Sequence, residues 1–282
     1  MDIRVDWAFK HIFSKKEHLQ KIIKDLIEID IEVLEYLPNG LDIATEKDKK
    51  SVFDVLCRNT ATSEVFVLEM QTTRESDMND RLFYYGGSLI HNQVKSGDLI
   101  YSVKTVYILC IASYRVRHNQ PVPRGKVFFE YKMMETDTHE IFDGDKLRFY
   151  FLELERFDYY LDSESDLKEQ WCWIFNNMAT FAERPAALDE SFDGIIDEAS
   201  TRRLTLEERE AYMEARHLNE REQLVIFEGG REEGREEGRE EGIEIGRVTE
   251  RVEMAKKMKE DQVEPKVIAK YTGLSEEEIR NL

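Results

Sequence analysis

Apolar positions at the N-terminal end of the chain predict two helices. One face of the first carries Phe9, Ile12 and Phe13. The second has an apolar residue at every third or fourth position: Leu19, Ile22, Ile23, Leu26 and Ile27. Ser14 and Glu17 have the spacing of a capping box, which predicts that the second helix begins after Ser14.

Runs of β-branched and aromatic residues follow the helices. They predict strands over residues 51–57 and 65–71, joined as a hairpin by the polar stretch between them. A helix is expected over residues 77–95, and the apolar run 103–111 predicts a strand in the interior of a sheet. Two more strands are expected before helical spacing returns at Asp166.

A charged repeat marks the C-terminal part of the chain. The unit Arg-Glu-Glu-Gly begins at Arg231 and is repeated as far as Gly242, after which it decays. Opposite charges at helical spacing favour a helix, whereas a glycine in every unit opposes it by about 1 kcal/mol each. We interpret this segment either as a solvated charged linker or single helix, or as a helix used for self-association.

The last residues predict two short helices separated by Gly273. Pro265 suits the first turn of one helix, and Ser275 with Glu278 has capping-box spacing at the start of the other. This spacing is typical of a helix-turn-helix, but DNA phosphates would repel the acidic residues 276–278. We therefore favour a small packing or protein-interaction module over DNA recognition.

The charge of the chain limits what it binds. Charged residues make up 35% of the sequence, against about 25% in an average globular domain, which predicts a packed core with a long solvated segment. The net charge is −19, so any binding to nucleic acid requires a local basic patch or bridging metal ions. The densest basic stretch is the loop over residues 115–126, with Arg115, Arg117, Arg124 and Lys126.

Other features of the composition argue against several classes of protein. The longest apolar run spans residues 106–112, far short of the roughly 20 residues of a membrane helix. The first residues lack the apolar core of a signal peptide, so we expect a cytoplasmic protein without membrane contact. Cys57, Cys110 and Cys172 are widely spaced, which argues against a disulfide framework and a cysteine-rich zinc site.

Two acidic residues in the predicted hairpin are the most informative candidates for chemistry. Alternation along a strand places Glu69 and Gln71 on one face, and Asp54 shares that face if it opposes either of them. Both registers bring the two carboxylates within roughly 4.5–8 Å of each other. Two acids this close repel each other unless a cation lies between them, and oxygen ligands of this kind suit Mg²⁺ or Mn²⁺.

A second interpretation of the same residues needs no metal. In it, Asp54 and Glu69 lie on a solvated face of the sheet, beside the basic side chains of Lys49, Lys50 or Arg81. Carboxylates on strands usually face solvent. Spacing alone leaves both interpretations open.

Several short motifs are informative in combination. They are, in order, Asp6-Trp-Ala-Phe-Lys10-His-Ile-Phe, Lys49-Lys-Ser-Val-Phe-Asp54-Val, Glu69-Met-Gln71, Arg81-Leu-Phe-Tyr-Tyr85, Gly97 with Tyr101, and the charged tail with its regular glycines. In this combination the chain resembles the Rpn-type recombination-promoting nucleases, also described as PD-(D/E)XK nuclease family transposases. The resemblance spans residues 6–282.

The resemblance implies an α/β fold with a PD-(D/E)XK restriction-endonuclease-like core, in which helices flank a mixed central sheet. We expect this core over residues 1–185, followed by a helical, low-complexity C-terminal arm. The arm would comprise a helical extension over 186–228, the repeat segment over 229–247 and a helical tail over 248–282.

The resemblance also implies a metal site. Asp54, Glu69 and the backbone carbonyl of Met70 would hold Mg²⁺ or Mn²⁺, and Gln71 takes the place of the usual lysine. A neutral amide lends no positive charge, so we expect Gln71 to position a water by hydrogen bonding. Asp6 is the candidate for a further acidic residue from an early helix, although a helix N-cap explains it equally well.

The implied activity is metal-dependent cleavage of DNA with weak sequence specificity. Arg81 and the four basic residues of the loop 115–126 are the candidates for contacts with the DNA backbone. The expected assembly is a homo-oligomer formed through the C-terminal arm. The alternative is a catalytically weak or inactive homologue that acts as an oligomerising or inhibitory partner protein.

Overall fold

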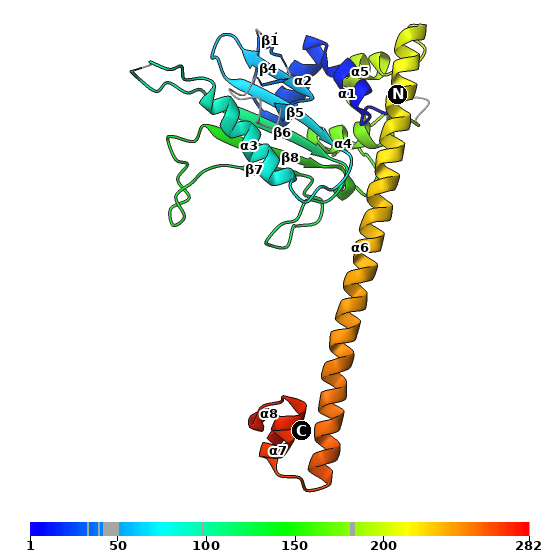
Figure 1. Ribbon diagram of the computed structural model, residues 1–282. Helices are drawn as coiled ribbons and strands as arrows, with labels where there is room; N and C mark the ends of the chain where they lie inside the picture. The colour runs from blue at the N-terminus through cyan, green and yellow to red at the C-terminus, as the bar shows by residue number, and fades with distance from the viewer. Residues whose placement is uncertain (33, 39, 42–50, 98, 181–183, 282) are drawn as a thin grey trace. The chain divides into compact units, whose positions relative to one another are not determined.

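The computed structural model describes the chain except for residues 33, 39, 42–50, 98, 181–183 and 282 (Figure 1). The chain divides into two compact units, Met1–Gln223 and Leu224–Leu282. None of the described helices has the length and the apolar character that crossing a membrane requires. The finer division expected along the C-terminal arm stays a prediction.

A six-stranded mixed sheet forms the centre of the first unit. Its strand order is β1-β4-β5-β6-β8-β7, with β5, β6 and β8 parallel and the other neighbours antiparallel. The strands are β1 (Leu34–Tyr36), β4 (Val55–Asn59), β5 (Val65–Gln71), β6 (Val106–Ala112), β7 (Phe128–Tyr131) and β8 (Leu147–Glu153). A separate pair is formed by β2 (Gly40–Leu41) and β3 (Ser51–Val52). The mixed central sheet predicted for the core is confirmed.

Helices cover both faces of this sheet (Figure 1). The helices on the first face are α1 (Asp6–Phe13), α2 (Lys16–Ile27) and α4 (Leu167–Asn177). The second face is covered by α3, Met78–His91, which ends before the predicted residue 95. Alternation along β5 separates the two cores, because Leu68 belongs to the first and Val67 to the second. The unit also contains three short elements: η1 (Leu154–Arg156), η2 (Glu190–Phe192) and α5 (Asp193–Glu198).

The strand β6 is buried along its whole length, as its apolar sequence predicts. It lies between two parallel neighbours and under helices on both faces, so neither side reaches solvent. Trp171 of α4 is also fully buried and packs against Phe192 with 5.0 Å between ring centroids. The cysteines Cys57, Cys110 and Cys172 are buried free thiols, in agreement with the sequence.

Two local predictions are wrong. Ser14 does not cap the second helix, because α2 has no side-chain cap and the Ser14 hydroxyl donates to the carbonyl oxygen of His11 at 2.7 Å. That bond closes the end of α1 and engages the side chain there. The strand expected over residues 51–57 is interrupted at Phe53 and Asp54, because β3 pairs with β2 and only β4 pairs with β5.

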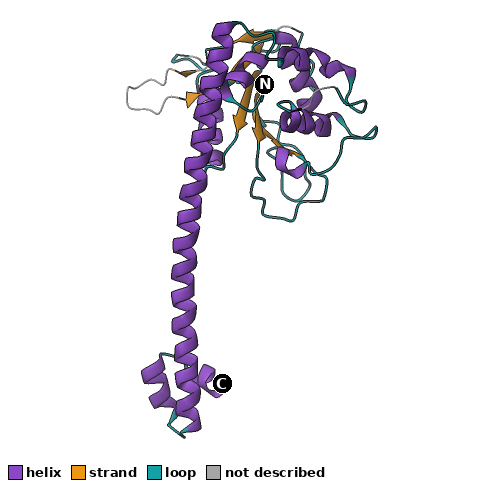
Figure 2. Cartoon of the chain, turned by 90° about the vertical axis from the view of Figure 1, so that its right-hand side faces the viewer, coloured by secondary structure: helices purple, strands orange, loops and turns teal. Residues whose placement is uncertain are grey.

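The charged repeat lies in a helix. The helix α6, Leu206–Glu260, contains the whole repeat, so the charge pattern prevails over the glycines (Figure 2). It begins at a capping box, in which the Thr205 N–H donates to Glu208 at 2.8 Å and the Glu208 N–H donates to Thr205 at 3.2 Å. The segment is therefore not an irregular linker, whereas its role in self-association stays a prediction.

The tail forms a small core of its own. Its helices are α7 (Pro265–Thr272) and α8 (Glu276–Asn281). Gly273 separates them with φ at +73°, a conformation that favours glycine. Ile268 and Ile279 are buried against Ala255 of α6. The predicted pair of short helices is confirmed, and its buried side chains agree with a packing module.

Candidate active site

Asp54 and Glu69 lie close together near the C-terminal end of β5. The ladder pairs Val55 of β4 with Leu68 of β5, so its continuation places Asp54 opposite Glu69. The Asp54 carboxylate accepts a hydrogen bond from the backbone N–H of Met70 at 2.8 Å. Of the two registers that the sequence left open, the structure has the one that opposes the two acids.

Both carboxylates are largely removed from solvent. Glu69 is 4% exposed because α3 covers its face of the sheet, and the Asp54 side chain is 17% exposed. Burial raises the pKa of Asp54 to about 6. Burial, together with the charge of Asp54, raises the pKa of Glu69 well above its ordinary value. The solvated-face interpretation is therefore wrong, and the neighbours it named at Lys49 and Lys50 lie outside the described residues.

The two acids have the properties of a cation site. The Glu69 Oε1 atom is buried and has no hydrogen-bond partner among the described residues. Across those residues, no cluster of three or more histidine, cysteine or acidic side chains gathers as metal ligands. The pair therefore suits an ion that keeps several water or substrate oxygens, as Mg²⁺ does.

The pKa of Asp54 predicts how the stability of the metal-free protein depends on pH. The pKa is about 6 in the folded chain against 3.8 in the unfolded chain, so the folded state binds more protons between these values. The free energy of unfolding therefore falls as pH rises from about 4 to about 6, by at most about 3 kcal/mol. Asp54→Asn should remove this contribution, so urea unfolding should depend less on pH in the variant. An equal pH dependence in both proteins would contradict the burial of Asp54.

Gln71 and Arg81 form a wall beside the acids. Gln71 is 9% exposed, and its side-chain oxygen accepts a hydrogen bond from Arg81 Nη2 at 3.0 Å. Arg81 also pairs with Glu75, which fixes the guanidinium against the amide. Asp6, Met70, Gln71 and Arg81 all line one cavity of about 280 Å³. Four of the predicted site residues therefore share one space, and the contact of Arg81 with DNA stays a prediction.

The helix α1 brings a further acid and a cation to Asp54. Asp6 is its first residue, and the N-cap residue Val5 has no side-chain cap, so the N-cap explanation of Asp6 is wrong. Lys10 lies one turn later, with its Nζ 2.5 Å from Asp6 Oδ1 and 3.5 Å from Asp54 Oδ1. Burial lowers the pKa of Lys10, but Asp6 and Asp54 outweigh this effect and hold the pKa above its ordinary value.

Lys10 is a site residue that the sequence patterns miss. The available signal is its spacing of four residues from Asp6 on a predicted helix. The same spacing occurs in ordinary surface ion pairs, so it does not point to Asp54. Only the packing of α1 near the beginning of β4 brings Lys10 and Asp54 together.

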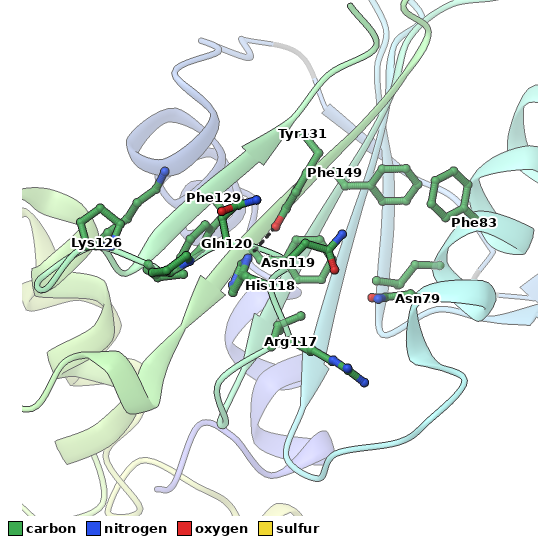
Figure 3. Close-up of a pocket in the computed structure, with 16 residues that line it drawn as sticks. Asn79, Phe83, Arg117, His118, Asn119, Gln120, Lys126, Phe129, Tyr131 and Phe149 are labelled. Atoms are coloured by element: carbon green, nitrogen blue, oxygen red, sulfur yellow. Dashed lines mark hydrogen bonds between the residues drawn. The ribbon is translucent and has the colours of Figure 1, made fainter. Parts of the chain in front are cut away.

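The basic loop over residues 115–126 does not line the cavity beside Gln71. Arg115 pairs with an acid of η1, and Arg124 is exposed. Arg117 and Lys126 line a second cavity, of about 800 Å³ (Figure 3). The contact of this loop with the DNA backbone stays a prediction.

A polar network around the buried Glu153 lies beside this second cavity and has no signal in the sequence. Glu153, at the end of β8, is fully buried. Its Oε1 atom is 2.5 Å from Nε2 of His118. Arg156 pairs with the same carboxylate. The Tyr131 hydroxyl is 3.0 Å from His118 Nδ1. These residues come from the loop, from β7, from the end of β8 and from η1, so no short motif contains them.

Comparison with known proteins agrees with this arrangement. A family model described as PD-(D/E)XK nuclease family transposase matches residues 3–229. Neither a curated protein nor a solved structure matches the chain. The matched range contains the whole sheet, its flanking helices and both cavities, and over these residues it confirms the resemblance to the PD-(D/E)XK nuclease family transposases.

Proposed function

Because the chain belongs to the PD-(D/E)XK nuclease family transposases, we propose that it is a metal-dependent DNA endonuclease with weak sequence specificity. The family itself indicates a nuclease-type function. The observation that supports metal dependence is the buried pair of Asp54 and Glu69. One oxygen of Glu69 has no partner among the described residues, and a cation would supply one.

The protein would hold the ion through Asp54, Glu69 and the backbone carbonyl of Met70. A magnesium or manganese ion held by these groups would supply Lewis-acid chemistry, polarising a phosphoryl oxygen and lowering the pKa of a water. The two acids must lose their protons before they act as ligands. Since burial raises the pKa of Asp54 to about 6, binding weakens as pH falls below that value.

Gln71 would position the attacking water. Its oxygen is already engaged by Arg81 at 3.0 Å, which leaves the NH₂ group as the hydrogen-bonding part of the amide. Arg81 therefore acts as a positioning residue that fixes the rotation of the amide. The amide lacks the positive charge of the lysine that usually stands at this position, and an ion pair with Glu75 partly offsets the charge of Arg81 beside it.

Lys10 would supply that charge from α1. Its ammonium lies 3.5 Å from Asp54, and Asp6 holds it there through an ion pair of 2.5 Å. A positive charge fixed beside the two acids stabilises negative charge that develops on a phosphate during hydrolysis. Asp6 is then a positioning residue for Lys10.

Cleavage of a supercoiled plasmid by the full chain tests the proposal. With magnesium the plasmid should be nicked or linearised, and with EDTA it should remain supercoiled. A second candidate function is supported by Gln71, which stands at the usual lysine position. In this candidate the chain is a catalytically weak or inactive homologue and acts as an oligomerising or inhibitory partner protein. That candidate predicts no cleavage under either condition.

A homodimer formed through the C-terminal arm is the proposed assembly. In the second unit, Leu224, Val225 and Phe227 of α6 are 60%, 68% and 69% exposed, and apolar side chains on a helix surface favour a partner. Light scattering of the full chain should give about twice the 33.4 kDa of one chain. Replacing the three residues with serine should lower the mass to that of one chain. A wild-type chain that is monomeric would contradict the proposal.

A further inference from the structure

The larger cavity has walls of aromatic side chains. It has a volume of about 800 Å³ and lies between α3, the loop 115–126 and the strands β7 and β8 (Figure 3). Phe83 is 62% exposed and Tyr131 is 44% exposed, and both line it. Phe83 is backed by Phe149, with 4.6 Å between ring centroids. The cavity therefore presents aromatic faces that are accessible to a flat ligand.

The charge around this cavity is opposite to that of the chain. The net charge of the chain is −19, yet none of the described lining side chains is acidic. Arg117 and Lys126 contribute positive charge to the wall (Figure 3). The nearby acid Glu153 is fully buried and paired with Arg156 and His118. The positive charge favours a ligand with a negative group, and the aromatic walls favour one with a flat ring.

One wall of the cavity is fixed before any ligand binds. The His118 ring is held by Glu153 at 2.5 Å and by Tyr131 at 3.0 Å. The same ring stacks on Phe129 with 4.3 Å between centroids. A wall that is ordered in advance lowers the entropy cost of binding.

Amide side chains add hydrogen-bonding groups to the aromatic walls. Asn79 at the start of α3 and the loop residues Asn119 and Gln120 line the cavity (Figure 3). An amide presents both donors and an acceptor, which matches the edge of a nucleobase. Aromatic faces, amides and positive charge together fit a nucleotide whose base is not stacked in a duplex.

The cavity and the two acids lie near the same end of the parallel strands, where β5, β6 and β8 finish. The parallel register aligns Gln71 of β5 with Ala112 of β6 and with Glu153 of β8. Glu69 and the cavity residue Phe151 are aligned in the same way, two residues earlier along their strands. Two strand spacings separate each pair, or about 10 Å. One strand of DNA is long enough to reach both places.

We propose that this cavity binds an unpaired base of the DNA substrate, so that the chain acts on DNA with single-stranded or looped-out nucleotides. This inference rests on the proposed nuclease function for the identity of the nucleic acid. A paired base has its faces covered by its neighbours in the duplex, so it cannot stack on Phe83 without leaving the helix.

Binding of labelled oligonucleotides to the full chain tests the inference. Fluorescence anisotropy in EDTA would compare a single strand, the matching duplex and the same duplex with an unpaired bulge. The wild type should bind the single strand and the bulged duplex more tightly than the paired duplex. Phe83→Ala should weaken binding to the unpaired forms about tenfold and leave binding to the paired duplex unchanged.

Two further variants make the test specific. Phe142→Ala removes an aromatic ring that is 56% exposed but does not line this cavity, so it should bind like the wild type. Phe83→Trp keeps an aromatic face and should bind the unpaired forms at least as tightly as the wild type. Melting temperatures of all variants confirm that each is folded.

Equal binding of the three DNA forms by the wild type, or an unchanged affinity in Phe83→Ala, would overturn the inference and assign the cavity to another ligand, such as an apolar peptide. The readout uses no metal and no cleavage. Failure of the nuclease proposal would appear separately, as a plasmid left uncut by the wild type with magnesium.

Discussion

Magnesium should raise the melting temperature of the wild-type chain and leave that of Asp54→Asn unchanged. An ion held by the proposed site would bind the folded chain alone, because only folding brings Asp54 opposite Glu69. At a concentration of about 100 times the Kd, such binding adds about 2.7 kcal/mol to the free energy of unfolding. For a domain of this size that corresponds to roughly 5–10 °C. Differential scanning fluorimetry with and without magnesium measures the shift.

Asp54→Asn should also differ from the wild type without metal. The variant loses one of two close, buried carboxylates, so at neutral pH it should be at least as stable as the wild type. Asp158→Asn is a matched control, because Asp158 is exposed and its substitution should leave the full magnesium shift. A full shift in Asp54→Asn would place the metal elsewhere on the protein.

Lys10→Met should lower the rate of DNA cleavage by roughly a hundredfold while the magnesium shift survives. The substitution keeps the length of the side chain but removes the charge that lies 3.5 Å from Asp54. Loss of one group that stabilises charge in the transition state typically costs a factor of about 100 to 1,000. Single-turnover cleavage of a labelled DNA, with magnesium at saturation, measures the rate.

The control for this substitution is Lys16→Met, which removes an exposed lysine from the first turn of α2. It should cleave at the wild-type rate. Lys10→Arg keeps the positive charge and should recover part of the activity that Lys10→Met loses. A wild-type rate in Lys10→Met would show that the ammonium serves only to hold α1 against Asp54.

Local patterns in the sequence predict the sheet and most of its helices. The apolar run that forms β6 indicates a buried strand, because a strand covered on both faces typically has apolar residues at nearly every position. The alternation along β5 places Glu69 and Gln71 on one face, and the structure agrees. The position of Asp54 opposite Glu69 was one of two registers that the hairpin sequence allows.

The properties that depend on tertiary packing do not appear in these patterns. Burial of Glu69 requires α3 to cover the sheet, and the contact of Lys10 with Asp54 requires α1 to pack near the beginning of β4. The pair of His118 and Glu153 joins residues from a loop and a distant strand. Ser14 shows the same limit at short range, because its hydroxyl has two possible partners and the competing carbonyl of α1 engages it.

Plasmid cleavage by matched variants measures most directly whether Asp54 and Glu69 form a metal-dependent nuclease site. The wild type and Asp158→Asn should nick supercoiled DNA at the same rate with magnesium, and neither should nick it in EDTA. Asp54→Asn should lose at least a thousandfold in rate, because the substitution would remove a ligand from the proposed metal site. Nicking by Asp54→Asn at the wild-type rate would contradict the assignment of the site.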